Sequence, residues 1–250
     1  MMSLTKVSLT DVVKKQYVYK LKAYSQVFMS LIFLQLLAIF FSLNGVGGMF
    51  SSGGSIEVQV KYFSADYVAA FTMLWGFITA ILITTKAYLN DDFLFVTNRV
   101  SSNLSNVVFL LTASGIGGIT AMLSSYLLKA IVYYFISDLS LKSTTVLDAP
   151  LEMLMGIFST ILYVFLFCAL GYLVGMLVQI SKAFTVLLPA AFFGGLILDG
   201  LNGKSGVIAY VFAFFFTESS LVLFMVKIIV TAVLVFSGAI VLSNRMEVRA

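Results

Sequence analysis

The chain has 250 residues, of which 61% are hydrophobic and only 10% are charged, and its mean hydropathy is +1.07. Soluble domains carry roughly 45–50% apolar and about 25% charged residues, so this composition excludes a water-soluble domain and predicts an integral membrane protein. The formal net charge is +4, and the sequence holds no histidine and one cysteine, Cys168. A disulfide within the chain is therefore excluded, and a metal or haem site with the usual ligands is not expected.

Six apolar runs are long enough to cross a bilayer, which takes about 17–25 residues of helix. They are Val27–Leu43, Tyr67–Thr85, Val107–Leu128, Met153–Ile180, the shorter Ala183–Leu198, and Leu221–Leu242. These runs are too long and too uniformly apolar for barrel strands, so we expect helices, which satisfy their own backbone hydrogen bonds in lipid. The predicted fold is an all-α integral membrane protein with a single transmembrane domain over residues 1–250.

Lysine and arginine predict the orientation, because cytoplasmic loops carry an excess of both. With both termini in the cytoplasm, the inner flanks hold ten basic residues: Lys6, Lys14, Lys15, Lys20, Lys22, Lys86, Arg99, Lys182, Arg245 and Arg249. The outer side holds three, Lys61, Lys142 and Lys204. We therefore expect a multi-pass protein of the cell membrane with both termini cytoplasmic and a Gly/Ser-rich outer loop from Asn44 to Asp66.

Residues 8–25 precede the first span and are predicted to form an amphipathic helix. Ser8 and Asp11 make a capping-box pattern, in which the serine caps the first turn. The apolar face, at about 100° per residue, comprises Leu9, Val13, Tyr17, Leu21 and Tyr24. We expect this helix to lie in the inner interface with Lys15 and Lys22 toward the headgroups, and Lys20, which falls on the apolar face, to snorkel. The alternative is a basic flank that only sets topology.

The run Val207–Phe216 is apolar but too short to cross the membrane. Its ten residues would cover about 15 Å as a helix, against a hydrocarbon core of about 30 Å. We expect this run to be re-entrant from the outer side, just before the last span.

The segment 91–106, DDFLFVTNRVSSNLSN, lies between two spans on the predicted cytoplasmic side. Asp91 and Asp92 are good caps for a short helix, and four apolar residues follow them. These are Phe93, Leu94, Phe95 and Val96. The polar run from Thr97 to Asn106 is expected to lead back to the membrane as a loop. An exposed apolar patch of this kind either returns to the interface or fills a groove on a partner.

These features resemble the permease subunits of ABC-two-type exporters. The amphipathic leading helix, six spans, short helical loop after the second span and re-entrant piece before the sixth follow that family's pattern. Locally, FLFVTNRVSSN is similar to the loop that the family places against its ATPase subunit. The stretch LGYLVGMLVQISKAFTVLLPAAFFGG is similar to its fourth-span exit, basic turn and fifth span. Arg99 stands where the family's loops often carry a proline.

The resemblance implies a permease subunit of an ATP-driven exporter, moving an amphipathic or hydrophobic cargo such as a peptide, a lipid-like molecule or a drug. Two permease chains, identical or related, would enclose a path, and two ABC ATPase subunits would dock through the 91–106 loop, where Arg99 would meet acidic groups. The sequence has no G-x-x-x-x-G-K-[ST] motif, so ATP and Mg are expected on the partner and not on this chain. Membrane lipid is a further expected partner, and nucleic acid is not.

Three other classes of function are alternatives to export: an intramembrane enzyme, an ion-driven carrier and a membrane sensor or immunity protein. An intramembrane enzyme would need histidine or paired acids within the spans, or a Ser-Lys pairing in place of a serine–histidine one. The scarcity of carboxylates in the spans also argues against an ion-driven carrier. We therefore do not expect an enzyme. A membrane sensor or immunity protein that binds a toxin or peptide without transport stays open as the alternative.

Lys227 falls within the last span, where a charge costs roughly 2.5–3.5 kcal/mol at the membrane centre. It should face a cavity, a partner or, by snorkelling, the outer headgroups. Glu218, Asp199 and Glu152 lie near the same outer level and could pair with it. Lys227 and Glu218 are therefore candidates for the cargo path or an outer gate.

Gly171 and Gly175 form a G-x-x-x-G motif in the fourth span. This spacing favours a close approach of two helix backbones. The approach could occur within the chain or between two subunits.

Overall fold

The computed structural model describes residues 8–45, 47–53, 56–62, 64–85, 87–88, 98–135, 150–201, 206–218 and 220–245. Six helices in these ranges are long and apolar enough to cross a membrane. They are α2 (Ser25–Ser42), α3 (Asp66–Ile83), α5 (Arg99–Phe135), α6 (Pro150–Ile180), α7 (Phe184–Leu201) and α9 (Leu221–Arg245). Each overlaps one of the six predicted runs, so the prediction of six apolar spanning helices is confirmed by length and composition.

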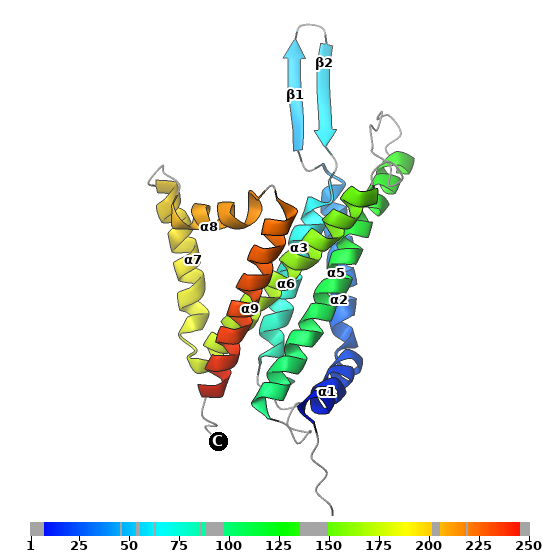
Figure 1. Cartoon of the computed structure of the whole chain (residues 1–250). Coiled ribbons are helices and arrows are strands. Elements are labelled where there is room, and N and C mark those ends of the chain that lie inside the picture. The colour runs from blue at the N-terminus through cyan, green and yellow to red at the C-terminus, as the bar shows by residue number, and fades with distance from the viewer. Residues whose placement is uncertain are drawn as a thin grey trace, which may run out of the picture.

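The six helices run alternately between two ends of a bundle (Figure 1). One end carries α1 (Leu9–Ala23), the start of α5 and the end of α9, and is called the α1 end. The other, called the hairpin end, carries β1 (Gly47–Gly53), β2 (Ile56–Tyr62) and α8 (Val207–Phe216). The first and last described helices therefore meet the same end of the bundle.

The helix α1 begins at the predicted capping box. The backbone N–H of Asp11 donates to Ser8 Oγ at 3.2 Å, and the Ser8 hydroxyl donates to Asp11 Oδ2 at 2.6 Å. Lys14, Lys15 and Lys22 are exposed. The buried side of α1 consists of Val13, Gln16 and Lys20 and continues to Tyr24. The helix is thus two-sided, but its buried side holds two polar residues where an apolar face was expected.

The predicted outer loop between the first two spans contains an antiparallel hairpin. In this hairpin Gly47 pairs with Tyr62 and Gly53 pairs with Ile56. The strands project beyond the helices at the hairpin end (Figure 1). All spans are helical, as predicted, and the hairpin is an addition outside them.

The helix α6 is the centre of the bundle and packs against α3, α5 and α9. Its buried residues include Val164, Cys168 and Tyr172, which meet Ala80 of α3 and Phe236 of α9 in one apolar cluster. Because three helices pack on α6, a shift of α6 would be felt through most of the core.

The G-x-x-x-G motif lies where α6 crosses α3. A Cβ placed on Gly171 would collide with the carbonyl oxygen of Phe77, and one on Gly175 would collide with the hydroxyl of Thr84. From the α3 side, a Cβ on Gly76 would lie 2.9 Å from the sulfur of Cys168. The structure therefore places the motif at a close crossing of two helices within the chain.

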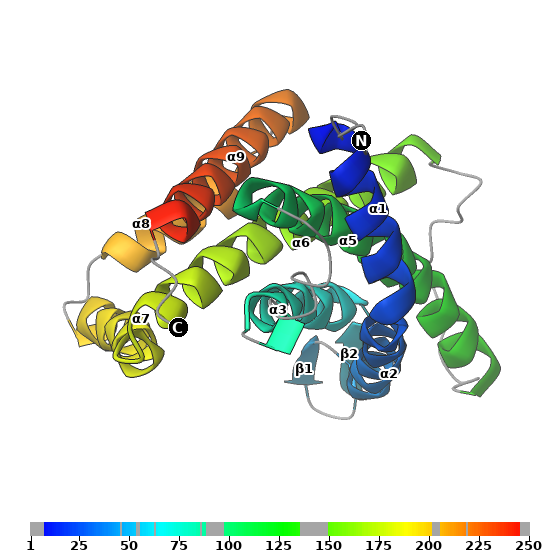
Figure 2. The same ribbon diagram turned by 90° about the horizontal axis from the view of Figure 1, so that it is seen from below.

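The helices α7 and α8 stand apart from this core. A tight turn joins α6 to α7, in which the N–H of Ala183 donates to Ser181 Oγ at 3.3 Å. Figures 1 and 2 show α7 beside the bundle, and Figure 1 shows α8 lying across its hairpin end. No described residue of α7 or α8 is buried. Apart from Phe215 and Phe216 of α8, which pack on α6 and α9, most of their apolar surface is thus left open by the described part of the chain.

Candidate functional site

The predicted ATPase contact falls partly outside the described residues. Asp91, Asp92, Phe93, Leu94, Phe95 and Val96 are not among them. Arg99 is described, and its Nη1 donates to the carbonyl oxygen of Ser243 in α9 at 2.7 Å. Before the segment, Tyr88 packs edge-on against Tyr24, with ring centroids 4.7 Å apart. Residues on both sides of segment 89–97 are therefore held to the α1 end of the bundle.

The residues from Arg99 onward are helical and form the start of α5. The N–H groups of Ser101 and Ser102 donate to the carbonyl oxygen of Asn98 at 3.0 and 3.2 Å, which starts α5. Its first turns bury five polar side chains: Ser101, Ser102, Asn103, Ser105 and Asn106. A serine can be buried in a helix when its hydroxyl bonds a carbonyl of the preceding turn, as the Ser105 hydroxyl does. The polar run that was predicted to lead back to the membrane is thus already part of the helix α5, where α1 and α6 cover it.

Lys20 of α1 is buried among these polar groups and is only 1% exposed. Its Nζ donates to Ser105 Oγ at 2.8 Å and to Asn106 Oδ1 at 2.5 Å. The prediction that Lys20 snorkels to the headgroups is wrong, because α5 offers oxygen partners inside the protein. A buried ammonium is costly without such partners and tolerated with them.

The hydrogen bonds continue from α5 into α6. Asn106 Nδ2 donates to the hydroxyl of Tyr172 at 3.3 Å, and this hydroxyl donates to Asn103 Oδ1 at 2.8 Å. Tyr172 is fully buried, and its ring lies 5.7 Å from that of Phe236 in α9. We call Lys20, Asn103, Ser105, Asn106 and Tyr172 the polar cluster. It links α1, α5 and α6 at the α1 end.

Two buried amide side chains on α1 and α5 have hydrogen-bonding atoms without a partner among the described residues. Gln16 is 0% exposed, and in the described part of the chain neither its Nε2 nor its Oε1 has a partner. The Nδ2 of Asn103, which is 2% exposed, has none either. A buried polar group without a partner costs about 1–3 kcal/mol. The present arrangement of these helices therefore leaves bonds unmade that another arrangement could form.

Sequence reasoning did not identify the polar cluster as a site. Two signals pointed to it: a lysine on an otherwise apolar helix face, and the polar run SSNLSN directly before an apolar span. Tyr172 gives no signal of its own, because its neighbours in the span are apolar and glycine residues. Its role follows only from the contact of α6 with α5.

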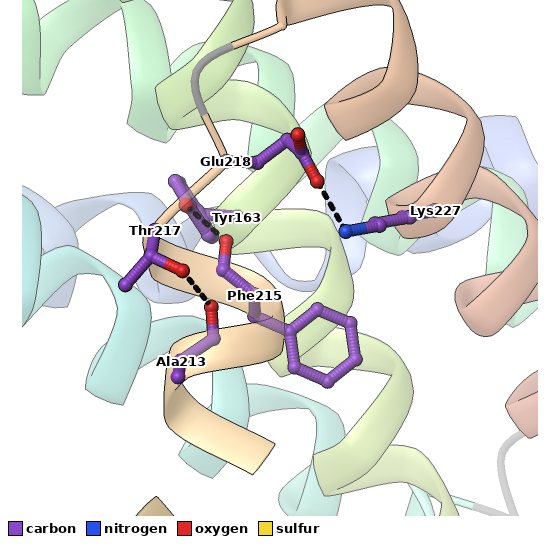
Figure 3. A network of polar contacts seen from close by, with 6 residues as sticks. All are labelled: Tyr163, Ala213, Phe215, Thr217, Glu218 and Lys227. Atoms are coloured by element: carbon purple, nitrogen blue, oxygen red, sulfur yellow. Dashed lines mark hydrogen bonds and ion pairs between the residues drawn. The ribbon is translucent and has the colours of Figure 1, made fainter. Parts of the chain in front are cut away.

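A second polar site lies at the hairpin end (Figure 3). Lys227 of α9 pairs with Glu218, and their side chains are 28% and 20% exposed. The Lys227 Nζ also lies 4.3 Å from the ring centroid of Phe214 in α8, a cation–π contact. The two residues predicted as a cargo path or gate therefore do meet. Of the other acids considered, Glu152 is exposed in the first turn of α6.

Both ends of α8 are tied to other helices. Asp199 of α7 accepts from the N–H of Ile208 at 3.0 Å and so caps the start of α8. Near its end, the hydroxyl of Tyr163 in α6 donates to the carbonyl oxygen of Phe215 at 2.8 Å (Figure 3). Thr217 closes the last turn by donating to Ala213. Glu218, the partner of Lys227, comes two residues after the end of α8. The helix that precedes this ion pair is therefore anchored at both ends.

A third polar group joins α2, α3 and α5 inside the bundle. Gln35 Nε2 lies within hydrogen-bonding distance of Thr72 Oγ1, Thr120 Oγ1 and the carbonyl oxygen of Gly117, at 3.1, 3.0 and 3.3 Å. Such contacts hold membrane helices together. We assign Gln35 to helix packing.

No family model matches the chain, and no curated protein or solved structure matches it. Within the described ranges, no group of three or more His, Cys, Asp or Glu residues could hold a metal ion. The described polar contacts hold helices together, and the polar cluster joins three of them, α1, α5 and α6.

Proposed function

We propose that this chain is a membrane-spanning permease subunit of an ATP-driven ABC exporter, which moves an amphipathic or hydrophobic cargo out of the cell or out of the inner leaflet. The observation that supports it most is the anchoring around segment 89–97. Tyr88 packs on Tyr24 before the segment, and Arg99 bonds Ser243 after it. A partner that pulled on the segment would therefore move α5 and α9 together, which a loop that receives movement from an ATPase requires.

In the proposed topology the α1 end faces the cytoplasm, with both termini on that side. The helix α1 would then lie in the inner interface, with its buried side against the bundle and its exposed lysines toward anionic headgroups. Each lysine near such a surface contributes about 1 kcal/mol. The short helix α8 would be the re-entrant piece on the outer side.

Single cysteines test this topology in a Cys168→Ala background. Thr10→Cys lies on the exposed side of α1 and Leu151→Cys on the exposed start of α6. An impermeant thiol reagent applied to intact cells should label Leu151→Cys and leave Thr10→Cys unlabelled until the membrane is opened. Labelling of Thr10→Cys alone would reverse the topology and remove the proposed ATPase contact from the cytoplasm.

The cargo path is proposed to form between two permease chains. The open apolar surfaces of α7 and α8 suit a cargo that enters from the bilayer, or a second permease chain, identical or related. The Lys227–Glu218 pair would stand at the outer end of this path as its gate. ATP and Mg would bind the two separate ATPase subunits.

Purification of the tagged chain in mild detergent tests the proposal directly, because an ABC ATPase should come with it. Phe93→Ala with Phe95→Ala should release that ATPase, since a buried aromatic anchor at an interface is worth about 2 kcal/mol or more. Arg99→Ala should give a milder, salt-sensitive loss. The matched control is Phe33→Ala with Phe40→Ala, two aromatic residues of α2 that are 69% and 67% exposed. If the Phe93 and Phe95 variant keeps the ATPase, the segment is only a membrane anchor.

A further inference from the structure

We propose that the polar cluster is a switch that passes movement of the α1 end into α6 by exchanging hydrogen-bond partners. This inference rests on the proposed function and deepens it. It assigns a positioning role to Lys20 and Tyr172, neither of which would touch cargo or nucleotide.

The cluster lies directly behind the proposed ATPase contact. Asn103, Ser105 and Asn106 sit in the first turns of α5, just after Arg99. Lys20 joins them to α1, and Tyr172 joins them to α6. Because α6 packs against α3, α5 and α9, a displacement of Tyr172 reaches the centre of the bundle.

The unpartnered donor and acceptor atoms would allow a second arrangement of α1 against α5. Gln16 lies one helical turn before Lys20 on the buried side of α1, and both atoms of its amide lack partners. Asn103 already accepts from Tyr172 but has an unused donor in Nδ2. A shift of α1 against α5 could therefore break some of the present bonds and form others, with the same side chains buried in both states. Two states of similar free energy are what a ligand or partner can shift.

Gln35 shows what a fixed polar contact looks like in the same protein. Its amide nitrogen has three oxygen acceptors within reach, from Thr72, Thr120 and Gly117. The amide of Gln16 is more deeply buried and has no partner. Within the polar cluster the amide nitrogen of Asn103 likewise has no partner among the described residues. Gln35 therefore fastens helices through its amide nitrogen, whereas Gln16 beside the polar cluster and Asn103 within it are incompletely bonded in this state.

The experiment uses the full chain with its co-purified ATPase in lipid nanodiscs, with Cys168→Ala and a reporter cysteine at Ser220. Ser220 is exposed at the start of α9, where Phe224 packs on Tyr163 of α6 with ring centroids 4.8 Å apart. The rate of maleimide labelling is measured with and without Mg-ATP and vanadate. In the parent, trapping should change this rate by about fivefold or more, the usual size of coupling between sites.

Tyr172→Phe and Lys20→Met should each abolish this change while the bound ATPase stays at the parental amount. Tyr172→Phe removes only the hydroxyl, so it decides the matter if Lys20→Met fails to assemble. The controls are Lys22→Met on the exposed side of α1 and Tyr67→Phe of α3, which is 38% exposed. Both controls should respond as the parent does.

The outcomes separate the two proposals. Absence of any ATPase from the parent preparation overturns the proposed function and the switch with it. An ATPase that binds but leaves the labelling of the parent unchanged overturns the switch alone. A parental response that survives in Tyr172→Phe shows that the cluster only fastens helices, and this also overturns the switch.

Discussion

Two lysines lie within apolar surroundings at opposite ends of the molecule, and their charged groups are stabilised in different ways: Lys227 by an ion pair and Lys20 by hydrogen bonds to neutral oxygens. Lys227 at the hairpin end pairs with Glu218, nine positions away in the chain, and keeps 28% of its side chain exposed. Lys20 at the α1 end is 1% exposed, and Ser105 and Asn106 that bond it lie 85 and 86 positions away. A local partner near the rim makes a weak, adjustable contact. Distant partners in the interior make one on which the packing of three helices depends.

Replacing each of the two lysines by glutamate should give the largest difference in the yield of folded protein. Lys20→Glu would bury a carboxylate against the Asn106 oxygen and remove the donor, which costs on the order of 3–5 kcal/mol in other buried ion sites. We expect little or no monodisperse protein by size-exclusion chromatography. Lys227→Glu places two partly exposed carboxylates together and should still yield folded protein. Equal yields from both variants would mean that Lys20 is not buried as the structure describes.

The α3–α6 crossing lies between these two ends and should give the next largest effect. Gly171→Ala forces a Cβ onto the backbone of Phe77, and overpacking of this kind costs about 1–3 kcal/mol. The apparent Tm in detergent should fall clearly. Gly238→Ala is the matched control, since a Cβ on this glycine of α9 would meet nothing within 4 Å. A Tm for Gly171→Ala equal to that of the control would contradict the close crossing.

Two tyrosines of α6, one near each end of the bundle, allow the loss of stability at the two ends to be compared. Tyr172→Phe leaves Asn103 Oδ1 without its buried donor, which should cost about 1–2 kcal/mol. Tyr163→Phe removes a bond to the carbonyl oxygen of Phe215 in α8, a helix without any buried residue among those described, and should cost less. Thermal melts of the two variants in the same detergent test the order. A larger loss for Tyr163→Phe would place the tighter contact at the hairpin end.

The smallest effect is expected for the ion pair itself. Exposed or partly exposed pairs contribute about 0.2–1 kcal/mol and weaken with salt. A double-mutant cycle of Lys227→Met and Glu218→Gln should give a coupling energy in this range that shrinks between low and high salt. The exchange Lys227→Glu with Glu218→Lys should recover part of the stability lost in Lys227→Glu. A coupling energy well above this range would mean that the pair is as well shielded from water as the polar cluster.

Parts of the fold could be predicted from short stretches of the sequence alone. The Ser8–Asp11 capping box, the basic turn at Lys182 and the short helix Val207–Phe216 all appear where they were predicted. The hairpin was missed although β2 alternates apolar and polar residues in IEVQVKY, which is the usual strand signal. A short alternation of this kind is a weaker signal than the long apolar runs on either side, because it spans only seven residues.

The amino-acid sequence by itself determined that this is a membrane protein of six apolar helices, because length and hydropathy act within each run and need no neighbour. It also indicated that Lys227 needs a partner near the outer end of its span, but left Glu218, Asp199 and Glu152 open, and the structure decided for Glu218. Only the tertiary structure decided where Lys20 goes. An ammonium on an apolar face can reach the headgroups or enter the protein, and the choice depends on whether oxygen partners are packed against it. Those partners come from α5, which meets α1 only when the bundle is assembled.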